Sequence, residues 1–360
     1  MKNKIAFIVP YPKGIAPSQR FRFEQYLTFL QEEQYATSIF PFLTDKDYNL
    51  IYQPGKILLK SSGIFLAFLK RFFLMFQLSG FNLVFIHREA SPIGPPIFEW
   101  IIAKVLKKKI IYDFDDAIWL ENTSDTNHFV SKIKRHSKVA SICRWSSLIL
   151  CGNHFLMDFA KQHNTNVAYM PTTIDTQITD SQIKEHRNDD VTIGWTGTHS
   201  TIKYLYEIED VLFELQEKLR FNFVVISNQK PQFKKLNFTY IPWNKEQEIN
   251  DLLNLDIGIM PLLDNEWAKG KCGFKALQYM ALEIPCIISP VGVNTRIIEH
   301  DINGYLAKTD NEWKEYLTSM ILSKELRTKY GKKGRETIIN NYSVIAHSQH
   351  FSSFIKQFKA

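Results

Sequence analysis

Three lysines and two glycines stand together in the segment KGKCGFKALQYMA, residues 269–281. The segment follows a short apolar run that is typical of a buried strand, and its second half has the composition of a helix. A helix N-terminus carries partial positive charge, and glycines let a ligand approach the backbone closely. Lys271, Lys275 and Gln278, spaced i, i+4 and i+7, are expected to share one helical face. We therefore predict an anion site, most naturally for phosphate; a solvated basic face is the alternative.

A second turn from strand to helix is expected in IGWTGTHSTIKYL, residues 193–205. Gly194 and Gly197 permit a tight turn, and Thr198, His199 and Ser200 are suited to capping the helix. The segment has neither the GxGxxG pattern of dinucleotide-binding folds nor the GxxxxGKS/T pattern of P-loop enzymes, which argues against a dehydrogenase and against an ATPase. A plain N-cap with a structural glycine is the alternative.

Charged side chains are also expected at strand ends in the first half of the chain. YDFDDAIW, residues 112–119, places Asp113, Asp115 and Asp116 at the end of a strand, where carboxylates can bind sugar hydroxyls, act as a base or hold a divalent metal. FIHRE, residues 85–89, places His87 at the end of another strand. Arg20 and Arg22 follow the first strand, within reach of an anionic acceptor. Helix capping is the alternative for the acidic residues, and a structural role is the alternative for the histidine.

Apolar runs alternate with helical stretches along the chain, which indicates parallel sheets covered on both faces. Six strands are expected in the first half, at residues 5–10, 37–42, 83–88, 109–114, 147–152 and 167–171. One of the helices expected between them spans about 128–144. Six more strands are expected at residues 191–197, 221–227, 238–243, 256–262, 285–292 and 304–307. A polar stretch at 172–190 is interpreted as a linker. We predict two doubly wound α/β domains, 1–171 and 172–342, facing each other across a cleft, with a last helix at about 343–360 on the first domain.

The net charge of +7 is unevenly distributed along the 360 residues. Residues 1–171 contain 21 Lys and Arg against 13 Asp and Glu, whereas residues 172–360 contain 23 against 24. A basic first half suits an anionic membrane surface or a phosphate-bearing acceptor. Because no nucleic-acid-binding motif is recognised, nucleic acid is not an expected partner.

The cysteines and the apolar runs indicate in which cellular compartment the protein is expected. The N-terminal apolar run ends at Pro10, too soon for a signal peptide. The longest apolar stretch, residues 64–78, is split by Lys70 and Arg71, so neither half can span a bilayer. We interpret it as a core helix; the alternative is a helix with one face on a membrane surface or a lipid substrate. Four cysteines without CxxC pairing indicate a reduced, cytosolic protein with no metal site: Cys143, Cys151, Cys272 and Cys286.

Together these segments resemble the retaining glycosyltransferases of the GT-B fold, specifically glycosyltransferase family 4 (glycosyl transferases group 1). MPLLDNEWAKGKCGFKALQYMALEIPCIISPVGVN, residues 260–294, looks like the donor-binding segment of that family. YMPTTID, residues 169–175, is similar to its domain-linking segment, and YDFDDAIW to a loop of its acceptor domain. The resemblance covers nearly the whole chain. It implies two Rossmann-like domains and no cofactor beyond a nucleotide-diphosphate sugar as the donor substrate.

The resemblance also implies roles for particular residues. Gln278 stands where the family has the second glutamate of its E-x7-E motif, which holds the ribose, and Gly270 replaces the first, which contacts the sugar. The usual arginine and lysine after the first strand of the second domain are absent, so Lys271 and Lys275 would carry the charge at the diphosphate, with Asp115 as the third catalytic residue. The implied donor-binding residues are Gly197, Thr198, His199, Lys271, Cys272, Gly273, Phe274, Lys275, Gln278 and Asn294. From their places after expected strands, the residues expected to bind the acceptor are Arg20, Arg22, His87, Asp115 and Asp116.

The resulting hypothesis is a cytoplasmic glycosyltransferase, retaining and metal-independent, that acts in cell-surface polysaccharide or glycoconjugate synthesis. It would move a sugar from a nucleotide sugar to a glycan or lipid-linked acceptor, in solution or at the inner face of a membrane. Two rival interpretations remain open: a nucleotide-sugar-binding protein without turnover, and a sugar-nucleotide epimerase or phosphorylase on the same scaffold.

Overall fold

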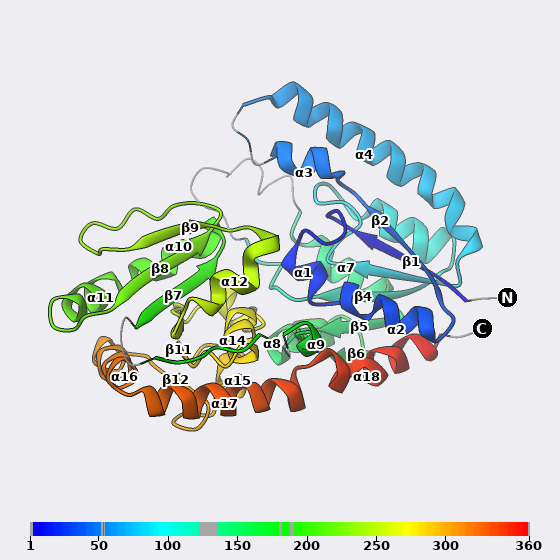
Figure 1. Ribbon diagram of the computed structural model, residues 1–360. Helices are drawn as coiled ribbons and strands as arrows, with labels where there is room; N and C mark the ends of the chain where they lie inside the picture. The colour runs from blue at the N-terminus through cyan, green and yellow to red at the C-terminus, as the bar shows by residue number, and fades with distance from the viewer. Residues whose placement is uncertain are drawn as a thin grey trace. The chain divides into compact units, whose positions relative to one another are not determined.

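A computed structural model describes residues 3–51, 53, 55–121, 135–179, 182–187 and 191–358 of the chain. The chain forms two compact units, whose elements Figure 1 labels where space allows. Unit 1 consists of Met1–Thr172 and His347–Ala360, and unit 2 consists of Thr173–Ala346. Each unit is an α/β layer structure with a six-stranded sheet between helices, so the expected fold class is confirmed.

The sheet of unit 1 is parallel throughout, in the order β2-β1-β3-β4-β5-β6. Most of its side chains on β1, β3, β4 and β5 are buried, as expected for strands covered by helices on both faces. The strands are β1 (Lys4–Val9), β2 (Ala36–Pro41), β3 (Leu83–His87), β4 (Lys109–Phe114), β5 (Leu148–Cys151) and β6 (Val167–Tyr169). The helices are α1 (Pro17–Arg20), η1 (Glu24–Tyr26), α2 (Leu27–Glu32), α3 (Asp45–Ile51), α4 (Ile57–Gln77), η2 (Leu78–Gly80), α5 (Ile97–Trp100), η3 (Ile101–Val105), α7 (Lys138–Trp145), α8 (His154–Lys161) and α18 (Val344–Lys356). The helix expected at about 128–144 lies partly outside the described residues, and α7 is its described part.

The sheet of unit 2 is also parallel, in the order β12-β11-β10-β7-β8-β9. The strand order reverses between β7 and β10, and in open α/β sheets ligands bind beyond the carboxyl ends of the strands at such a reversal. The strands are β7 (Thr192–Gly197), β8 (Asn222–Ser227), β9 (Thr239–Pro242), β10 (Ile257–Met260), β11 (Cys286–Ile288) and β12 (Tyr305–Leu306). The helices are α9 (Thr176–Thr179), α10 (His199–Tyr206), α11 (Glu209–Gln216), η4 (Lys245–Gln247), α12 (Glu248–Leu253), α13 (Glu266–Lys269), α14 (Phe274–Ala281), α15 (Asn294–Ile297), α16 (Asp310–Leu322) and α17 (Lys324–Asn341).

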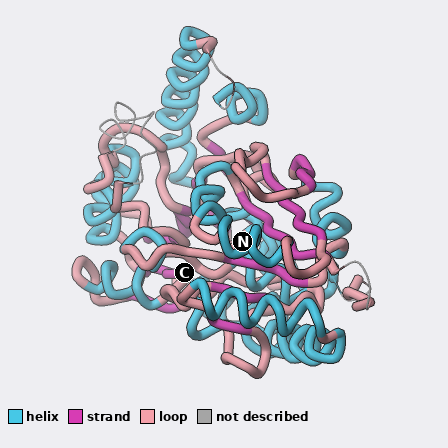
Figure 2. The backbone as a smooth tube through the Cα atoms, turned by 90° about the vertical axis from the view of Figure 1, so that its left-hand side faces the viewer, coloured by secondary structure: helices cyan, strands magenta, loops and turns pink. Residues whose placement is uncertain are grey.

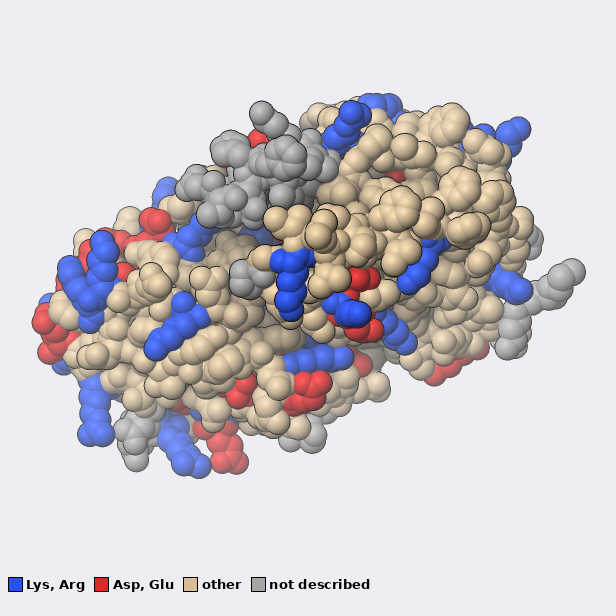
Figure 3. Space-filling model, turned by 90° about the horizontal axis from the view of Figure 1, so that it is seen from above, with Lys and Arg blue, Asp and Glu red and all other residues tan. Residues whose placement is uncertain are grey.

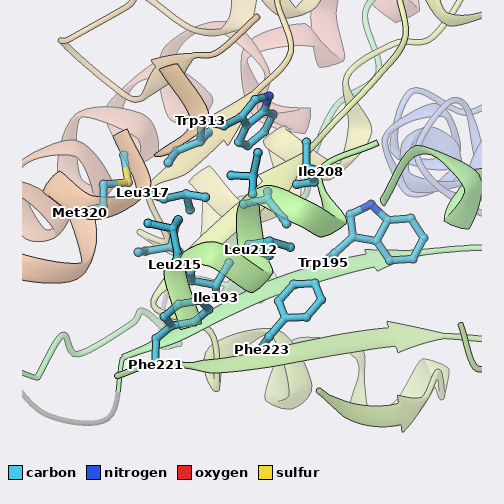
Figure 4. Packing of buried hydrophobic residues seen from close by; sticks show 14 of the residues in the cluster. Ile193, Trp195, Ile208, Leu212, Leu215, Phe221, Phe223, Trp313, Leu317 and Met320 are labelled. Carbon is cyan, nitrogen blue, oxygen red and sulfur yellow. The ribbon is translucent and has the colours of Figure 1, made fainter. Parts of the chain in front are cut away.

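A large apolar cluster fixes β7 in the middle of unit 2. Ile193 and Trp195 of β7 belong to the same cluster as Leu212 of α11, and Trp313 and Leu317 of α16 complete it (Figure 4). All five side chains are almost fully buried. Because interiors are packed about as densely as organic crystals, the end of β7 has little freedom to move. This rigidity matters because the candidate site begins there.

The C-terminal helix α18 packs on unit 1. The ring of Phe351 stacks on Tyr26 with 4.5 Å between centroids, and Lys356 Nζ donates to a carboxylate oxygen of Glu33 at 2.8 Å. The chain leaves unit 2 beside the point where it entered, because Ile174 N donates to Tyr342 O and Val344 N donates to Ile174 O.

The stretch 172–190, expected as a linker, is mostly part of unit 2. Thr173 and Ile174 are buried, and Lys184 N donates to Leu282 O at 2.9 Å. Residues 180, 181 and 188–190 lie outside the described residues. The polar composition of the stretch was misleading, since Lys184 Nζ donates to Leu253 O at 3.1 Å and His186 Nε2 lies 3.0 Å from Glu283 O within the unit.

The apolar stretch 64–78 belongs to the long helix α4, and the expectation of a core helix is wrong for one side of it. Ala67, Leu74 and Met75 are buried, but Phe65, Phe73 and other large apolar side chains are exposed. In Figures 1 and 2 much of the length of α4 lies at the outside of unit 1. No helix among the described residues is both long enough and apolar enough to cross a bilayer.

Candidate active site

The predicted anion site begins at a residue with a left-handed backbone conformation, which glycine adopts readily and other residues rarely do. Gly273 is the N-cap of α14 and has φ +69°. A Cβ atom there would lie 2.2 Å from Ile297 Cδ1 and 3.4 Å from Asn294 Oδ1. Glycine therefore allows the chain to turn into α14 while staying close to α15. The turn belongs to the connection that follows β10, after the short helix α13, and β10 lies beside β7 at the strand-order reversal.

Lys275 connects the start of α14 to the end of β7. Its Nζ lies 5.3 Å from the centroid of the Trp195 ring, and its Cε lies 2.9 Å from the position of a Cβ at Gly197. Trp195 is almost fully buried, so its ring is a fixed platform for the ammonium group. The two segments that the sequence singled out, 193–205 and 269–281, are thus brought together at the carboxyl ends of β7 and β10.

Lys271 is not on the same helical face as Lys275, contrary to expectation. It lies between α13, which ends at Lys269, and α14, which begins at Phe274. The left-handed Gly273 interrupts the helical register, so the i, i+4 argument fails. The Nζ of Lys271 lies 5.4 Å from the centroid of the Trp267 ring. Each of the two lysines is therefore placed over the ring of a tryptophan.

The remaining predicted donor residues divide into exposed and buried ones. Thr198 and His199 are exposed at the β7–α10 turn, where His199 N donates to Asn228 Oδ1 at 2.8 Å. Thr198 is the N-cap of α10, but its side chain makes no capping hydrogen bond, and Thr198 Oγ1 lies 2.9 Å from Ser200 Oγ. The buried or half-buried residues line the α14 turn: Cys272, Phe274, Gln278 and Asn294. Asn294 Nδ2 donates to Ser289 O at 2.9 Å, which ties the turn after β11 to α15.

Tyr279 fastens α14 to β7, and sequence reasoning missed it. Its hydroxyl accepts a hydrogen bond from Thr196 N at 3.0 Å, and a Cβ at Gly258 would lie 2.4 Å from the Tyr279 ring. Burial raises the pKa of Tyr279 well above its usual value, so the hydroxyl keeps its proton. A glycine inside a strand often marks a close approach, so Gly258 in the middle of β10 was the available signal.

In unit 1, the side chains expected at the ends of β3 and β4 form a buried charge network. His87 lies opposite Asp113 in the register of the two strands, and His87 Nδ1 lies 2.7 Å from Asp113 Oδ2. The guanidinium of Arg22 donates to the same carboxylate and to Met170 O. Although burial alone would raise the pKa of Asp113, the Arg22 charge and the His87 hydrogen bond hold it below its usual value. Arg22 and His87 are completely buried, which leaves neither exposed for the expected contact with an acceptor.

Asp115 and Asp116 form a second network, with Arg88. Arg88 Nε donates to Asp115 Oδ1 at 2.8 Å, and Arg88 Nη2 donates to Asp116 Oδ2 at 2.6 Å. Burial by itself would lower the pKa of Arg88, but the two carboxylates raise it. Arg88 has φ +57°, an uncommon conformation for a residue with a side chain. Arg20 lies elsewhere at the end of α1, with its Cζ 4.8 Å from the centroid of the Phe21 ring.

Comparisons with known proteins agree with this architecture. Residues 231–337, which include β10 and α14, match the family model of glycosyl transferases group 1. The fold is similar to that of the sucrose-phosphate synthase of Thermosynechococcus elongatus, with 11% identity, 99% and 98% coverage of this chain and that chain, and a TM-score of 0.72. It is also similar to a glycosyltransferase of Rickettsia africae ESF-5 (13% identity, 99% and 98% coverage, TM-score 0.67) and to HepE of Anabaena in complex with UDP and glucose (12% identity, 99% and 100% coverage, TM-score 0.63). No curated protein sequence matches the chain significantly.

The family match and the fold lead to the same conclusion. The match covers the segment that carries the lysines of the candidate site, and the fold likeness covers both units. The chain therefore has the GT-B fold, contains a glycosyl transferases group 1 domain in its second unit, and is a glycosyltransferase.

Proposed function

We propose that the protein transfers a sugar from a nucleotide-diphosphate sugar to a glycan or lipid-linked acceptor, and that Lys271 and Lys275 bind the diphosphate. The observation that carries this proposal is the position of Lys275. Its side chain joins the first turn of α14 to the end of β7, on either side of the strand-order reversal of unit 2. A helix N-terminus and an ammonium group at that point together attract a phosphate.

The known ligands of a structural neighbour support this choice of donor. HepE of Anabaena has been crystallised with UDP and with UDP-glucose. The β7–α10 turn, with Thr198 and His199 exposed, and the α14 turn are the parts of unit 2 that we assign to the nucleotide sugar. Gln278 is largely buried, and we assign it to the ribose through its amide group.

The chemistry we propose needs no nucleophile from the protein. The bond between the anomeric carbon and the diphosphate oxygen breaks, and the electron pair stays on the diphosphate. The acceptor oxygen bonds to the anomeric carbon on the same face, and its proton passes to the departing phosphate oxygen. Lys271 and Lys275 stabilise the charge that grows on the leaving group, so the step requires no metal ion or further cofactor. Retention of configuration follows from the resemblance to glycosyltransferase family 4.

In unit 1, we assign Asp115 and Asp116 to positioning the acceptor, with Arg20. Both carboxylates are half-buried and are held by Arg88, which fixes their orientation. Arg22 and His87 act through Asp113 instead, as positioning residues at the ends of β3 and β4. The basic first half of the chain supports an anionic acceptor, and we place the reaction in the cytoplasm, in cell-surface polysaccharide or glycoconjugate synthesis.

Replacement of Lys275 by alanine tests the diphosphate assignment. Because one charged contact to phosphate is lost, Lys275→Ala should weaken UDP binding by roughly 10- to 100-fold in calorimetry. The same variant should lower kcat by about 10²- to 10³-fold with an accepted sugar donor.

A matched control is available in the same unit. The Nζ of Lys329 lies 5.5 Å from the Tyr330 ring, much as Lys275 lies over Trp195, but on α17, which contacts α14 at its C-terminal end and not at the Gly273 turn. Lys329→Ala should leave UDP affinity unchanged. Equal UDP affinity in a folded Lys275→Ala variant would remove the assignment. UDP binding without donor hydrolysis or transfer, across a panel of donors and acceptors, would favour the non-catalytic binding protein.

A further inference from the structure

The helix α4 presents a broad apolar face to the surroundings of unit 1. We call this surface the α4 face. Its exposed side chains recur every three or four residues and cover two adjoining sides of the helix. Their exposed fractions lie between 39% and 85%, and they are Leu58, Leu59, Phe65, Leu66, Leu69, Phe72, Phe73 and Phe76. Scattered exposed apolar residues are normal, but a contiguous set of this kind on one helix marks an interaction surface.

The opposite side of α4 is firmly fixed, so the exposed face is not a consequence of a loose helix. Ala67 packs against Phe42 and Leu43. The buried guanidinium of Arg71 donates to Phe40 O at 2.9 Å and to Val9 O at 3.1 Å, at the carboxyl ends of β2 and β1. Arg71 thus anchors the helix to the sheet, while its neighbour Lys70 is exposed.

The apolar surface continues from α4 onto the neighbouring helices α5 and η3. The ring of Phe68 on α4 lies 5.9 Å from that of Phe98 on α5. Ile97, Trp100 and Val105 are exposed on α5 and η3. Beside them is a shallow hollow of about 370 Å³ with an almost wholly apolar lining of Pro95, Pro96, Ile97, Trp100 and Trp145.

The exposed charges on α4, α5 and η3 are basic, whereas Asp45 and Asp47 lie on the neighbouring helix α3, with Asp47 against Gly63 of α4. The sequence of α4 contains no Asp or Glu, and Lys60 and Lys70 lie on it. Lys104 and Lys107 are exposed at η3, whereas the acidic residue of α5, Glu99, is completely buried. The view of Figure 3 shows basic side chains around a wide area of uncharged residues on this side of unit 1.

We propose that the α4 face, together with α5 and η3, lies in the headgroup layer of an anionic lipid bilayer. Phenylalanine and leucine side chains enter the acyl boundary, the lysines contact lipid phosphates, and the hollow beside Trp100 takes an acyl chain. A helix of 21 residues, about 31 Å long, lies along the surface and does not span it. This inference rests on the proposed function in one respect: such a surface would present a lipid-linked acceptor.

Charge favours a bilayer over a second copy of the chain as the occupant. In a two-fold contact the α4 face would meet itself, so Lys60, Lys70 and the lysines of η3 would face like charges. Anionic phosphates complement them instead. The aromatic side chains beside lysines are also the composition of helices that lie at membrane interfaces.

Vesicle flotation tests the proposal on the full chain. The protein should float with phosphatidylcholine vesicles that contain phosphatidylglycerol and much less with phosphatidylcholine alone. The triple change Phe65→Gln, Phe72→Gln and Phe76→Gln should lower the partition coefficient by roughly tenfold or more per side chain. Lys60→Gln and Lys70→Gln should each lower binding to the anionic vesicles by roughly fivefold.

Equally exposed apolar residues of unit 2 provide the control. The triple change Ile302→Gln, Leu322→Gln and Ile339→Gln removes comparable side chains and should leave flotation unchanged. Wild-type protein that fails to float with either vesicle, or a phenylalanine variant that floats as well as wild type, would overturn the proposal. So would light scattering that shows dimers in wild type and monomers in the phenylalanine variant without any flotation.

The same preparations separate this inference from the proposed function. The phenylalanine variant should keep its UDP affinity, and Lys275→Ala should keep its vesicle binding. Wild-type protein that binds UDP but does not float with either vesicle removes the bilayer contact alone. Normal flotation with unchanged UDP affinity in Lys275→Ala removes the diphosphate site alone.

Discussion

At the scale of single residues, the buried carboxylate of Asp113 organises the end of the unit 1 sheet. It accepts from Arg22 and lies 2.7 Å from His87, and all three side chains are nearly inaccessible to solvent. A charge in such a place is stable only with its partners, because desolvation of an ion is expensive. The network therefore holds the turn between α1 and η1, β3 and β4 in a fixed relation.

Replacement of Asp113 by asparagine should destabilise the protein by about 3–5 kcal/mol, because the Arg22 charge would remain buried without its counterion. Urea unfolding at neutral pH measures this change. The exposed pair Asp210 and Lys235 offers a contrast, and Asp210→Asn should change the free energy of unfolding by less than about 1 kcal/mol. Similar effects of the two substitutions would contradict the proposed role of the network.

The same carboxylate should also make stability depend on acid pH. The pKa of Asp113 is lower in the folded state than the usual value, so its contribution to stability is full above the unfolded pKa of about 3.9. That contribution is lost as the pH falls through the folded pKa. Wild-type protein should lose stability more steeply than Asp113→Asn below about pH 4 in urea titrations at stepped pH. Parallel curves for the two proteins would contradict this.

At the scale of elements, the α14 turn combines an unusual backbone conformation with close packing. Gly273→Ala places a Cβ in a left-handed conformation and against Ile297 Cδ1. Gly94 has φ +81° and no atom within 4 Å of its Cβ position, so Gly94→Ala measures the backbone strain alone, about 1–2 kcal/mol. Gly273→Ala should be more destabilising than Gly94→Ala by at least about 1 kcal/mol in chemical unfolding, because of the added clash. Equal values would show that α15 yields without strain.

The elements were also the level at which sequence reasoning succeeded best. All twelve expected strands are present, because runs of apolar residues between helices are typical of sheets buried on both faces. The anion-site turn was predicted where Gly273 and α14 stand. The position of Lys271 outside α14 was not predicted. The left-handed residue that begins the helix has no strong sequence signal beyond the glycine itself.

The candidate site of unit 1 was harder to predict for a physical reason. Sequence order places His87, Asp115 and Asp116 at neighbouring strand ends, and the structure brings them to one edge of the sheet. Which of the charged side chains face the interior depends on the ion pairs that they form. Asp113 takes Arg22 and His87 into the interior, whereas Arg88 keeps Asp115 and Asp116 nearer the surface. Such pairings rest on distances of a few Å that one-dimensional patterns do not contain.

At the scale of the whole molecule, the last helix belongs to the unit that the first residues begin. Phe351 of α18 stacks on Tyr26 and lies 6.0 Å from the Phe85 ring. Phe351→Ala should destabilise unit 1 by about 3–5 kcal/mol. Native-state hydrogen exchange should then show faster exchange of the most protected amides of unit 1, on the order of 10²- to 10⁴-fold, with those of unit 2 unchanged.

The reciprocal change is Phe223→Ala in the core of unit 2, which should speed exchange in unit 2 instead. A uniform increase over both units in either variant would show that they unfold as one.

The double crossing of the chain at Ile174 and Ser343 has a consequence for biosynthesis. A ribosome releases the first 172 residues long before the segment that completes their fold, and all of the second unit emerges in between. Chains usually mature in the order in which they are made. In this protein the nascent first unit must wait, with the surface that packs on Phe351 uncovered, until α18 has been made.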